Sequence, residues 1–244
     1  SKDNMLKITN DGKMCALDMR LVDPTVEDNP DSKVNMAVNN IFNKWEETKD
    51  DSLTQVVFLD RSTPSKGFNL YDDIKSKLIA LGIPEEEIKF IHDAKNDKEK
   101  VKLFEDVNEG RVRILIGSTE KMGAGTNIQK KLCALHHIDV PWRPSDIEQR
   151  EGRILRQGND CKEVEIFRYA TEGTFDSYSW QTIEYKQKFI SQVMTNKPLG
   201  RSIDDVDEAA LNYAEIKSLA TGDPRIKRQL ELSTLSLIHI SEPT

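Results

Sequence analysis

The 244-residue sequence lacks the features of a disulfide-rich, zinc-binding or membrane protein. Its three cysteines, Cys15, Cys133 and Cys161, lie far apart and form no Cys-x-x-Cys pair. We therefore expect neither a disulfide framework nor a metal site, and a reducing, cytoplasmic compartment fits. No stretch approaches the roughly 20 apolar residues that a membrane-spanning helix needs. We expect no membrane partner.

The chain also lacks an excess of positive charge. It has 35 lysines and arginines against 42 acidic residues, which gives a net charge of −7. Dedicated nucleic-acid-binding domains are usually basic, so any contact with nucleic acid must come from a local patch. With 37% hydrophobic and 32% charged residues, the composition is typical of a globular protein. The length suffices for one α/β domain with additional helices.

The motifs that bind nucleotide phosphates and magnesium are absent from these residues. There is no Gly-x-x-x-x-Gly-Lys-Ser/Thr loop, and no Asp-Glu-x-His or Asp-Glu-x-Asp box follows a strand. The sequence therefore lacks the phosphate cradle, the magnesium ligands and the carboxylate that activates water. It also lacks a Gly-x-Gly-x-x-Gly run after the first expected strand, which argues against an unrelated Rossmann-like enzyme.

What is present is an alternation of short apolar runs and amphipathic helical segments. This order predicts a parallel sheet with helices on both faces, followed by a helical C-terminal extension. In the helix expected over 98–108, Val101, Phe104 and Val107 should face the interior. The expected strands are 55–59, 88–91, 112–116, 135–140 and 164–169, and the expected helices are 14–21, 32–48, 71–81, 98–108, 146–156, 175–194, 206–220 and 223–235.

The most informative segment runs from residue 111 to residue 159. An apolar strand feeds the glycine-rich turn 117–127, a second strand follows, and a helix then carries three arginines. Glycines after a strand let backbone amides approach a phosphate. Arg153 and Arg156, three residues apart on a helix, project from one side and can reach one polyanion together.

This order of segments resembles the C-terminal RecA-like lobe of superfamily 2 helicases, in the Swi/Snf-like branch. The turn 117–127 is similar to helicase motif V, and residues 149–158 are similar to motif VI. Pro141-Trp142-Arg143-Pro144 resembles the Trp-Asn-Pro element that precedes motif VI, with Arg143 in place of Asn. The amino-acid sequences of these segments are similar to those of the DarB-like helicase–methylase proteins of phages and conjugative elements. The resemblance extends over about residues 35–194.

The resemblance implies roles for the residues of the last helix. Arg153 and Arg156 would reach the γ-phosphate of ATP bound by another lobe and spread the charge that develops there, an effect of about a thousandfold or more in rate. Gln149 would help to organise the same interlobe site, unless it is only a solvated helix residue. For Arg150 two interpretations stay open: a phosphate contact, or a structural ion pair with Glu148 or Glu151.

The turn after the third strand and the loop after the first one supply further candidates. Gly123 and Gly125 would let the backbone approach the nucleotide, and Asn127 would face the ribose or motif VI. Contacts with a DNA backbone are expected from Ser118, Thr119, Arg61 and Thr63. His136 and His137 are adjacent in a strand, so their side chains should point to opposite faces and not form a two-histidine metal site.

The resemblance implies that the chain is the C-terminal lobe of an ATP-dependent DNA helicase or translocase, encoded by a bacterium or a phage. Its partners would be an N-terminal RecA-like lobe of the same protein, which would hold ATP and Mg²⁺, and double-stranded DNA. An adenine methylase domain is possible in the longer protein. The chain by itself should not hydrolyse ATP. The alternative is a non-catalytic RecA-like module that binds a nucleotide or a partner.

The pattern also suggests how the chain is divided. We expect a lead-in over 1–31, the helicase C-terminal domain over 32–194 and a helical extension over 195–235. Residues 236–244 break the preceding helical pattern and resemble a translated sequencing adapter, so they are expected to be a non-native tail. The alternative for them is an ordinary frayed terminus.

Overall fold

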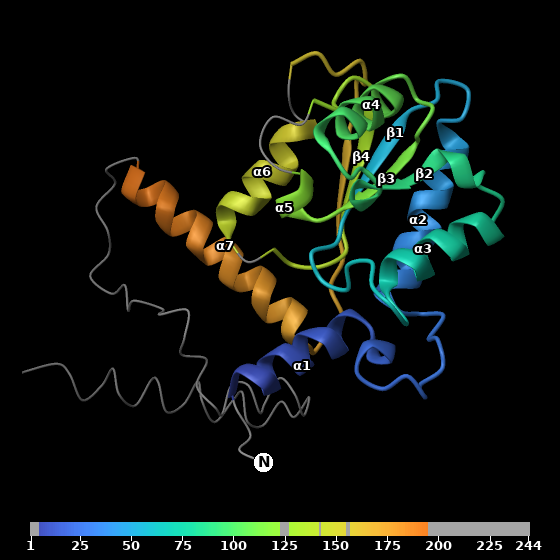
Figure 1. Ribbon diagram of the computed structural model, residues 1–244. Coiled ribbons are helices and arrows are strands. Elements are labelled where there is room, and N and C mark those ends of the chain that lie inside the picture. Colours follow the sequence, from blue (N-terminus) through green and yellow to red (C-terminus); the bar gives the residue numbers. More distant parts are fainter. Residues whose placement is uncertain (1–4, 123–126, 142, 155–156, 195–244) are drawn as a thin grey trace, which may run out of the picture. The chain divides into compact units, whose positions relative to one another are not determined.

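A computed structural model describes residues 5–122, 127–141, 143–154 and 157–194 (Figure 1). The chain divides into two compact units. One is residues 17–171, and the other combines residues 1–16 with residues 172–244. The segments 195–235 and 236–244, for which an extension and a tail were predicted, lie outside the described residues. Within the described ranges, none of the helices is both long and apolar enough to cross a membrane.

The unit formed by residues 17–171 is built on a five-stranded sheet in which all neighbouring strands are parallel. The strand order is β2-β3-β1-β4-β5. The predicted fold class is therefore confirmed. The strands are β1 (Thr54–Phe58), β2 (Ile88–Phe90), β3 (Ile114–Gly117), β4 (Leu132–His137) and β5 (Glu165–Arg168). The prediction for β4 was wrong by three residues, because the apolar run continues past His137 although the strand pairing ends there.

Helices cover both faces of this sheet, as the alternation of segments predicted (Figure 1). Buried side chains of α2 (Lys33–Glu47) and α3 (Leu70–Ala80) pack on one face, together with Val57 and Ile116. Side chains of α4 (Asp97–Asn108), α5 (Thr119–Met122) and α6 (Pro144–Ile154) pack on the other, together with Val56 and Leu115. Short 3-10 turns complete the unit: η1 (Met19–Leu21), η2 (Glu85–Glu87) and η3 (Ile91–Asp93).

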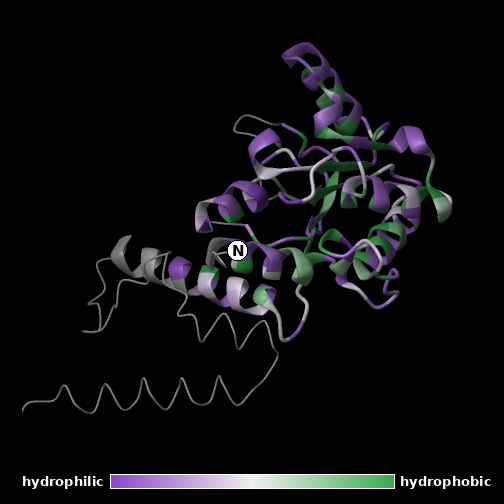
Figure 2. Cartoon of the chain, turned by 60° about the horizontal axis from the view of Figure 1, so that its bottom comes forward, coloured by the Kyte–Doolittle hydropathy of each residue, from purple (hydrophilic) through white to green (hydrophobic). Residues whose placement is uncertain are grey.

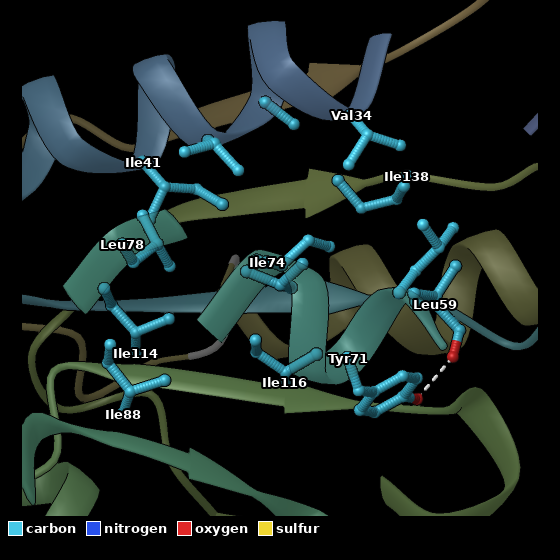
Figure 3. Close-up of a cluster of buried hydrophobic side chains, with 14 of the residues drawn as sticks. Val34, Ile41, Leu59, Tyr71, Ile74, Leu78, Ile88, Ile114, Ile116 and Ile138 are labelled. Atoms are coloured by element: carbon cyan, nitrogen blue, oxygen red, sulfur yellow. Dashed lines mark hydrogen bonds between the residues drawn. The ribbon is translucent and has the colours of Figure 1, made fainter. Parts of the chain in front are cut away.

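Strand alternation explains why two separate cores form. Neighbouring residues of a strand point to opposite faces, so an apolar run such as β1 supplies both cores at once. Figure 3 shows the core between the sheet and helices α2 and α3, where the hydroxyl of Tyr71 donates to the backbone carbonyl of Leu59. In Figure 2 the strands of this unit carry hydrophobic colour, and the outer surfaces of its helices are largely hydrophilic.

The helix ends follow the local chemistry of the sequence. Ser32 caps α2, because its hydroxyl accepts a hydrogen bond from the amide of Asn35. Asn69 and Asn96 cap α3 and α4 in the same way. Gly82 and Gly110 follow the ends of α3 and α4 and adopt φ of 109° and 78°.

Two expectations about helices were wrong. Val101 is 56% exposed, whereas Val107 is fully buried, because six residues separate these positions and the face of α4 that meets the sheet is narrow. The short helix expected over 14–21 is instead the end of α1 (Met5–Leu17) and the turn η1, with Asp18 between them. The Asp18 carboxylate accepts from the amide of Arg20 and so starts a new turn.

The unit that combines residues 1–16 with residues 172–244 contains most of α1 and the helix α7 (Phe175–Met194). The bounds of α7 agree with the prediction. Its described core consists of Ala16 and Phe175, against which Ile8 packs.

Candidate functional site

The candidate site lies where the central strands end at their carboxyl edge. Phe58 of β1 pairs with Gly117 of β3 on one side and with His137 of β4 on the other. Two residues beyond these three aligned positions come Asp60, Thr119 and Asp139. Ligands in open parallel sheets bind at this edge, so polar residues here are candidates for function.

Asp60 joins the ends of β1 and β3. Its Oδ1 accepts from the backbone amide of Thr119 at 2.6 Å, and its Oδ2 accepts from the Thr119 hydroxyl at 2.9 Å. Ser118, one residue earlier, places its Oγ 3.3 Å from the amide of Lys121. The residues that open the predicted motif V are therefore tied to the end of β1 and begin a short helix, α5.

Arg150 of α6 reaches the same place and is fully buried. Its Nε donates to the Thr119 hydroxyl at 2.7 Å, and its Nη2 donates to Asp60 Oδ2 at 2.6 Å. Its Nη1 lies 3.0 Å from His137 Nδ1 and 3.3 Å from the carbonyl oxygen of Asp139. The guanidinium also stacks 4.9 Å above the ring centre of Phe58. A buried arginine requires this degree of pairing, because an uncompensated buried charge is strongly destabilising.

Asp139 completes the cluster on the β4 side. Its Oδ2 accepts from the amides of Asp60 and Arg61, both at 2.8 Å, and its Oδ1 lies 3.5 Å from Arg150 Nη2. Burial raises the pKa of Asp139 to about 6, and Arg150 opposes this effect. The carboxylate thus holds the chain after β1 in a fixed path from Leu59 to Arg61.

The ion-pair interpretation of Arg150 named the wrong partners. The carboxylates it contacts are Asp60 and Asp139. Glu151, a proposed partner, lies 2.6 Å from Arg168 Nη2 and 3.2 Å from His137 Nε2 instead. The carboxylate partners of Arg150 lie just beyond the ends of β1 and β4 and not on α6 itself, because the buried face of the helix carries Arg150 toward that edge of the sheet.

The other predicted motif VI residues fall on or beside α6. Gln149 is exposed, in contrast to its buried neighbour Arg150. Arg153 belongs to α6, one turn after Gln149. Arg156 lies outside the described residues. Residues four apart share one face of a helix, so the positions of Gln149 and Arg153 lie on one side.

The structure describes only some of the residues predicted to bind the cofactor or nucleic acid. Gly123 and Gly125 lie outside the described residues, so their roles stay predictions. Asn127 is exposed, and its carbonyl oxygen accepts from the side-chain amide of Asn108. Arg61 and Thr63 are half-buried in the loop after β1. The structure brings Thr119 and Arg61 to one sheet edge through Asp60 and Asp139. Thr63 lies two residues beyond Arg61 in the same loop.

The two adjacent histidines of β4 point to opposite faces, as expected. His136 lies 2.9 Å from the Tyr169 hydroxyl and 2.9 Å from Gln55 Oε1, whereas His137 lies beside Arg150. In the part of the chain that the structure describes, no cluster of three histidine, cysteine or acidic side chains is suited to hold a metal ion.

Sequence reasoning missed Asp60 and Asp139. The available signal was positional: each aspartate stands two residues after the end of a buried parallel strand. Charged residues at that point have to be paired or functional, because the strands before them are buried. A search for acidic partners of Arg150 at strand ends, and not only within its own helix, would have found both.

A comparison with protein families supplies the deciding observation. Residues 47–158 match the family model of the helicase conserved C-terminal domain. Residues 47–158 are therefore similar to a helicase C-terminal domain. Four of the five strands, all but β5, and helices α3 to α6 lie within the matched range. The residues of the Arg150 cluster lie within the same range.

Similarity to known sequences agrees with this result. The Defense against restriction protein B of Escherichia phage P1 is 34% identical over 93 residues, which cover 38% of this chain and 4% of that protein. The uncharacterized ATP-dependent helicase YqhH of Bacillus subtilis (strain 168) is 33% identical over 92 residues, 37% of this chain and 16% of that protein. The chain spans only a small part of either relative. The predicted resemblance to superfamily 2 helicases of the DarB-like group is confirmed.

Solved structures with similar folds include the C-terminal part of the Fun30 ATPase domain, with a TM-score of 0.47 and 18% identity over 68% of this chain and 52% of that one. The DNA-bound DUF1998 helicase MrfA has a TM-score of 0.44 and 16% identity over 64% of this chain and 20% of that one.

Proposed function

We propose that the chain is the C-terminal lobe of an ATP-dependent DNA translocase or helicase. In this proposal Gln149 and Arg153 of α6, together with Arg156, face ATP that is bound by an N-terminal RecA-like lobe of a longer protein. The turn 117–127, with Gly123, Gly125 and Asn127, forms the neighbouring wall of the site. Ser118, Arg61 and Thr63 are the candidates for contacts with the DNA backbone.

The observation that carries the proposal is the buried contact between Arg150 and Asp60. It fixes α6 at the carboxyl edge of the sheet, beside the residues that open motif V. Arg153 then stands on a helix whose rotation about its own axis is set by three hydrogen bonds of Arg150. A planar guanidinium is suited to charge that develops on a transferred phosphoryl group.

The chemistry of the chain fits one half of such a site. The sequence has no phosphate-binding loop and no acidic box, and a relative of the chain is named an ATP-dependent helicase. ATP would supply the reactive phosphoryl group, and Mg²⁺ would be held by carboxylates of the other lobe. The similarity to the Swi/Snf-like branch favours movement along duplex DNA without full strand separation. An adenine methylase domain would belong to another part of the longer protein.

The test is a steady-state ATPase assay on the isolated chain and on the longer protein, each with and without duplex DNA. We expect turnover only in the longer protein, and stimulation by duplex DNA. Single-stranded DNA and RNA serve as alternative activators. Absence of turnover in the longer protein under all these conditions would instead favour a non-catalytic RecA-like module that binds a nucleotide or a partner. Robust hydrolysis by the isolated chain would contradict the divided site.

A further inference from the structure

Three side chains from distant parts of the chain form a closed ring of hydrogen bonds. The Thr119 hydroxyl donates to Asp60 Oδ2 at 2.9 Å, Arg150 Nη2 donates to the same oxygen at 2.6 Å, and Arg150 Nε donates to the Thr119 hydroxyl at 2.7 Å. Asp60 follows β1, Thr119 follows β3 and Arg150 lies on α6. The ring therefore links two strand ends to a helix.

Arg150 is not placed to contact a ligand. Its side chain is fully buried, and each of its three nitrogens has an acceptor within the protein. Moving the guanidinium toward a phosphate would break these bonds and leave Asp139, which is also buried, without its cation. Such a loss is costly, because a buried carboxylate requires a partner.

We propose that Arg150 is a positioning residue that acts through Thr119, and that Thr119 serves this ring and not the DNA backbone. The ring sets the rotation of α6, so that Gln149 and Arg153 are held at a fixed place relative to the turn that begins at Ser118. Successive residues of an α-helix are spaced about 100° apart around its axis. If the hydrogen bonds of Arg150 are lost, α6 can turn about this axis, and the positions of Gln149 and Arg153 move with it. This inference rests on the proposed function for its effect on catalysis.

A substitution at Thr119 can open the ring of hydrogen bonds with little other change to the structure. Thr119→Val removes the hydroxyl and keeps the shape, whereas Thr119→Ser keeps the hydroxyl. Thr25→Val is the matched control, because the Thr25 hydroxyl also donates to an aspartate, Asp23, but in the exposed loop before α2. In the longer protein, the assay measures kcat and the KM for ATP, with and without duplex DNA.

We expect Thr119→Val to lower kcat about tenfold to a hundredfold, the effect of an ångström-scale misplacement of catalytic groups. The KM for ATP should change little, and the factor should be the same with and without DNA. Thr119→Ser and Thr25→Val should behave like the wild type. If Thr119→Val lowers only the DNA-stimulated rate, or raises the DNA concentration needed for stimulation, Thr119 contacts DNA and the inference is wrong.

Hydrogen exchange on the 244-residue chain tests the same link without any ATPase activity. Thr119→Val should accelerate amide exchange over residues 119–122 and across α6, and leave α3 unchanged. Unchanged exchange in α6 would overturn the positioning role even if the longer protein hydrolyses ATP. If the longer protein has no ATPase activity but exchange in α6 is accelerated, the proposed function is wrong. The role of the Thr119–Arg150 hydrogen bond in holding α6 would then still stand.

Discussion

His136 and His137 are adjacent in β4 and both are fully buried, yet they belong to separate hydrogen-bond networks. His136 lies between the Tyr169 hydroxyl and Gln55, and His137 lies between Arg150 and Glu151. Burial lowers the pKa of His136 to about 3, with the neighbouring His137 as a lesser cause. Burial also lowers the pKa of His137 to about 4, and Glu151 opposes this effect. Both rings are therefore neutral in the folded protein above about pH 5.

The histidines should make stability fall on acidification. Between about pH 4 and 6 the unfolded chain binds a proton at each histidine and the folded chain does not, so the free energy of unfolding rises with pH. The raised pKa of Asp139 acts oppositely in this window, because the folded state holds its proton. The two lowered histidine pKa values outweigh the one raised aspartate pKa, and the lowered pKa values of His92 and Glu151 act in the same direction as the histidines, so the net slope is positive. Urea unfolding at a series of pH values measures this slope.

Replacing one buried histidine should reduce the slope. His136→Gln removes a position at which the unfolded chain, but not the folded one, binds a proton between about pH 4.5 and 6, so the slope should fall by about 1.4 kcal/mol per pH unit. His92→Gln is the comparison, because His92 is only half-buried and its lowered pKa has a smaller effect. A wild-type slope in His136→Gln would show that His136 does not stay neutral in the folded state.

Replacing Gly117 and Gly152 by alanine should change the stability of the chain in opposite directions. A Cβ at Gly117 would lie 2.8 Å from Ile91 Cγ2 and 3.0 Å from Met122 Cγ, whereas one at Gly152 would meet nothing within 4 Å. Gly117→Ala should destabilise by about 1–3 kcal/mol, and Gly152→Ala should stabilise α6 by up to about 1 kcal/mol. Thermal unfolding of both variants measures this. Equal shifts of the same sign would contradict the packing described after β3.

The Arg150 cluster should dominate the stability of this edge of the sheet. Arg150→Ala leaves the buried Asp139 without a cation and should cost about 3–5 kcal/mol. Arg143→Ala removes an exposed arginine near the start of the same helix and should change stability by less than about 0.5 kcal/mol. Chemical unfolding of the 244-residue chain compares the two variants. If both variants lose equally little stability, Arg150 does not compensate the buried negative charge of Asp139.

The architecture was predictable because its cause is local. Apolar runs of β1 and β3, capping residues such as Ser32 and the stop at Gly82 each act within a few residues, and they led to the correct sheet and helices. The start of β4 was not predictable in this way, because strand ends depend on pairing with neighbours. The exposure of Val101 depended on the angle at which α4 meets the sheet.

The candidate site was predictable only from resemblance. The sequence placed Gln149, Arg150 and Arg153 on one helix, and that helix is found. It gave no indication that Arg150 turns inward, because its partners Asp60 and Asp139 lie 90 and 11 positions away in the sequence. Partners at such separations follow from strand order, which no local pattern contains.

Arg153 and Arg156 are proposed to stabilise charge that grows on the transferred phosphoryl group. The most direct measurement is duplex-DNA-stimulated ATPase activity of the longer protein, together with ATP affinity, for Arg153→Ala, Arg156→Ala and their lysine counterparts. Arg111→Ala, an exposed arginine before β3, is the control. We predict that each alanine variant loses about a thousandfold in kcat with ATP affinity nearly unchanged, and that lysine restores little, since a point charge does not reproduce a planar fork. Wild-type turnover in either alanine variant would contradict the account.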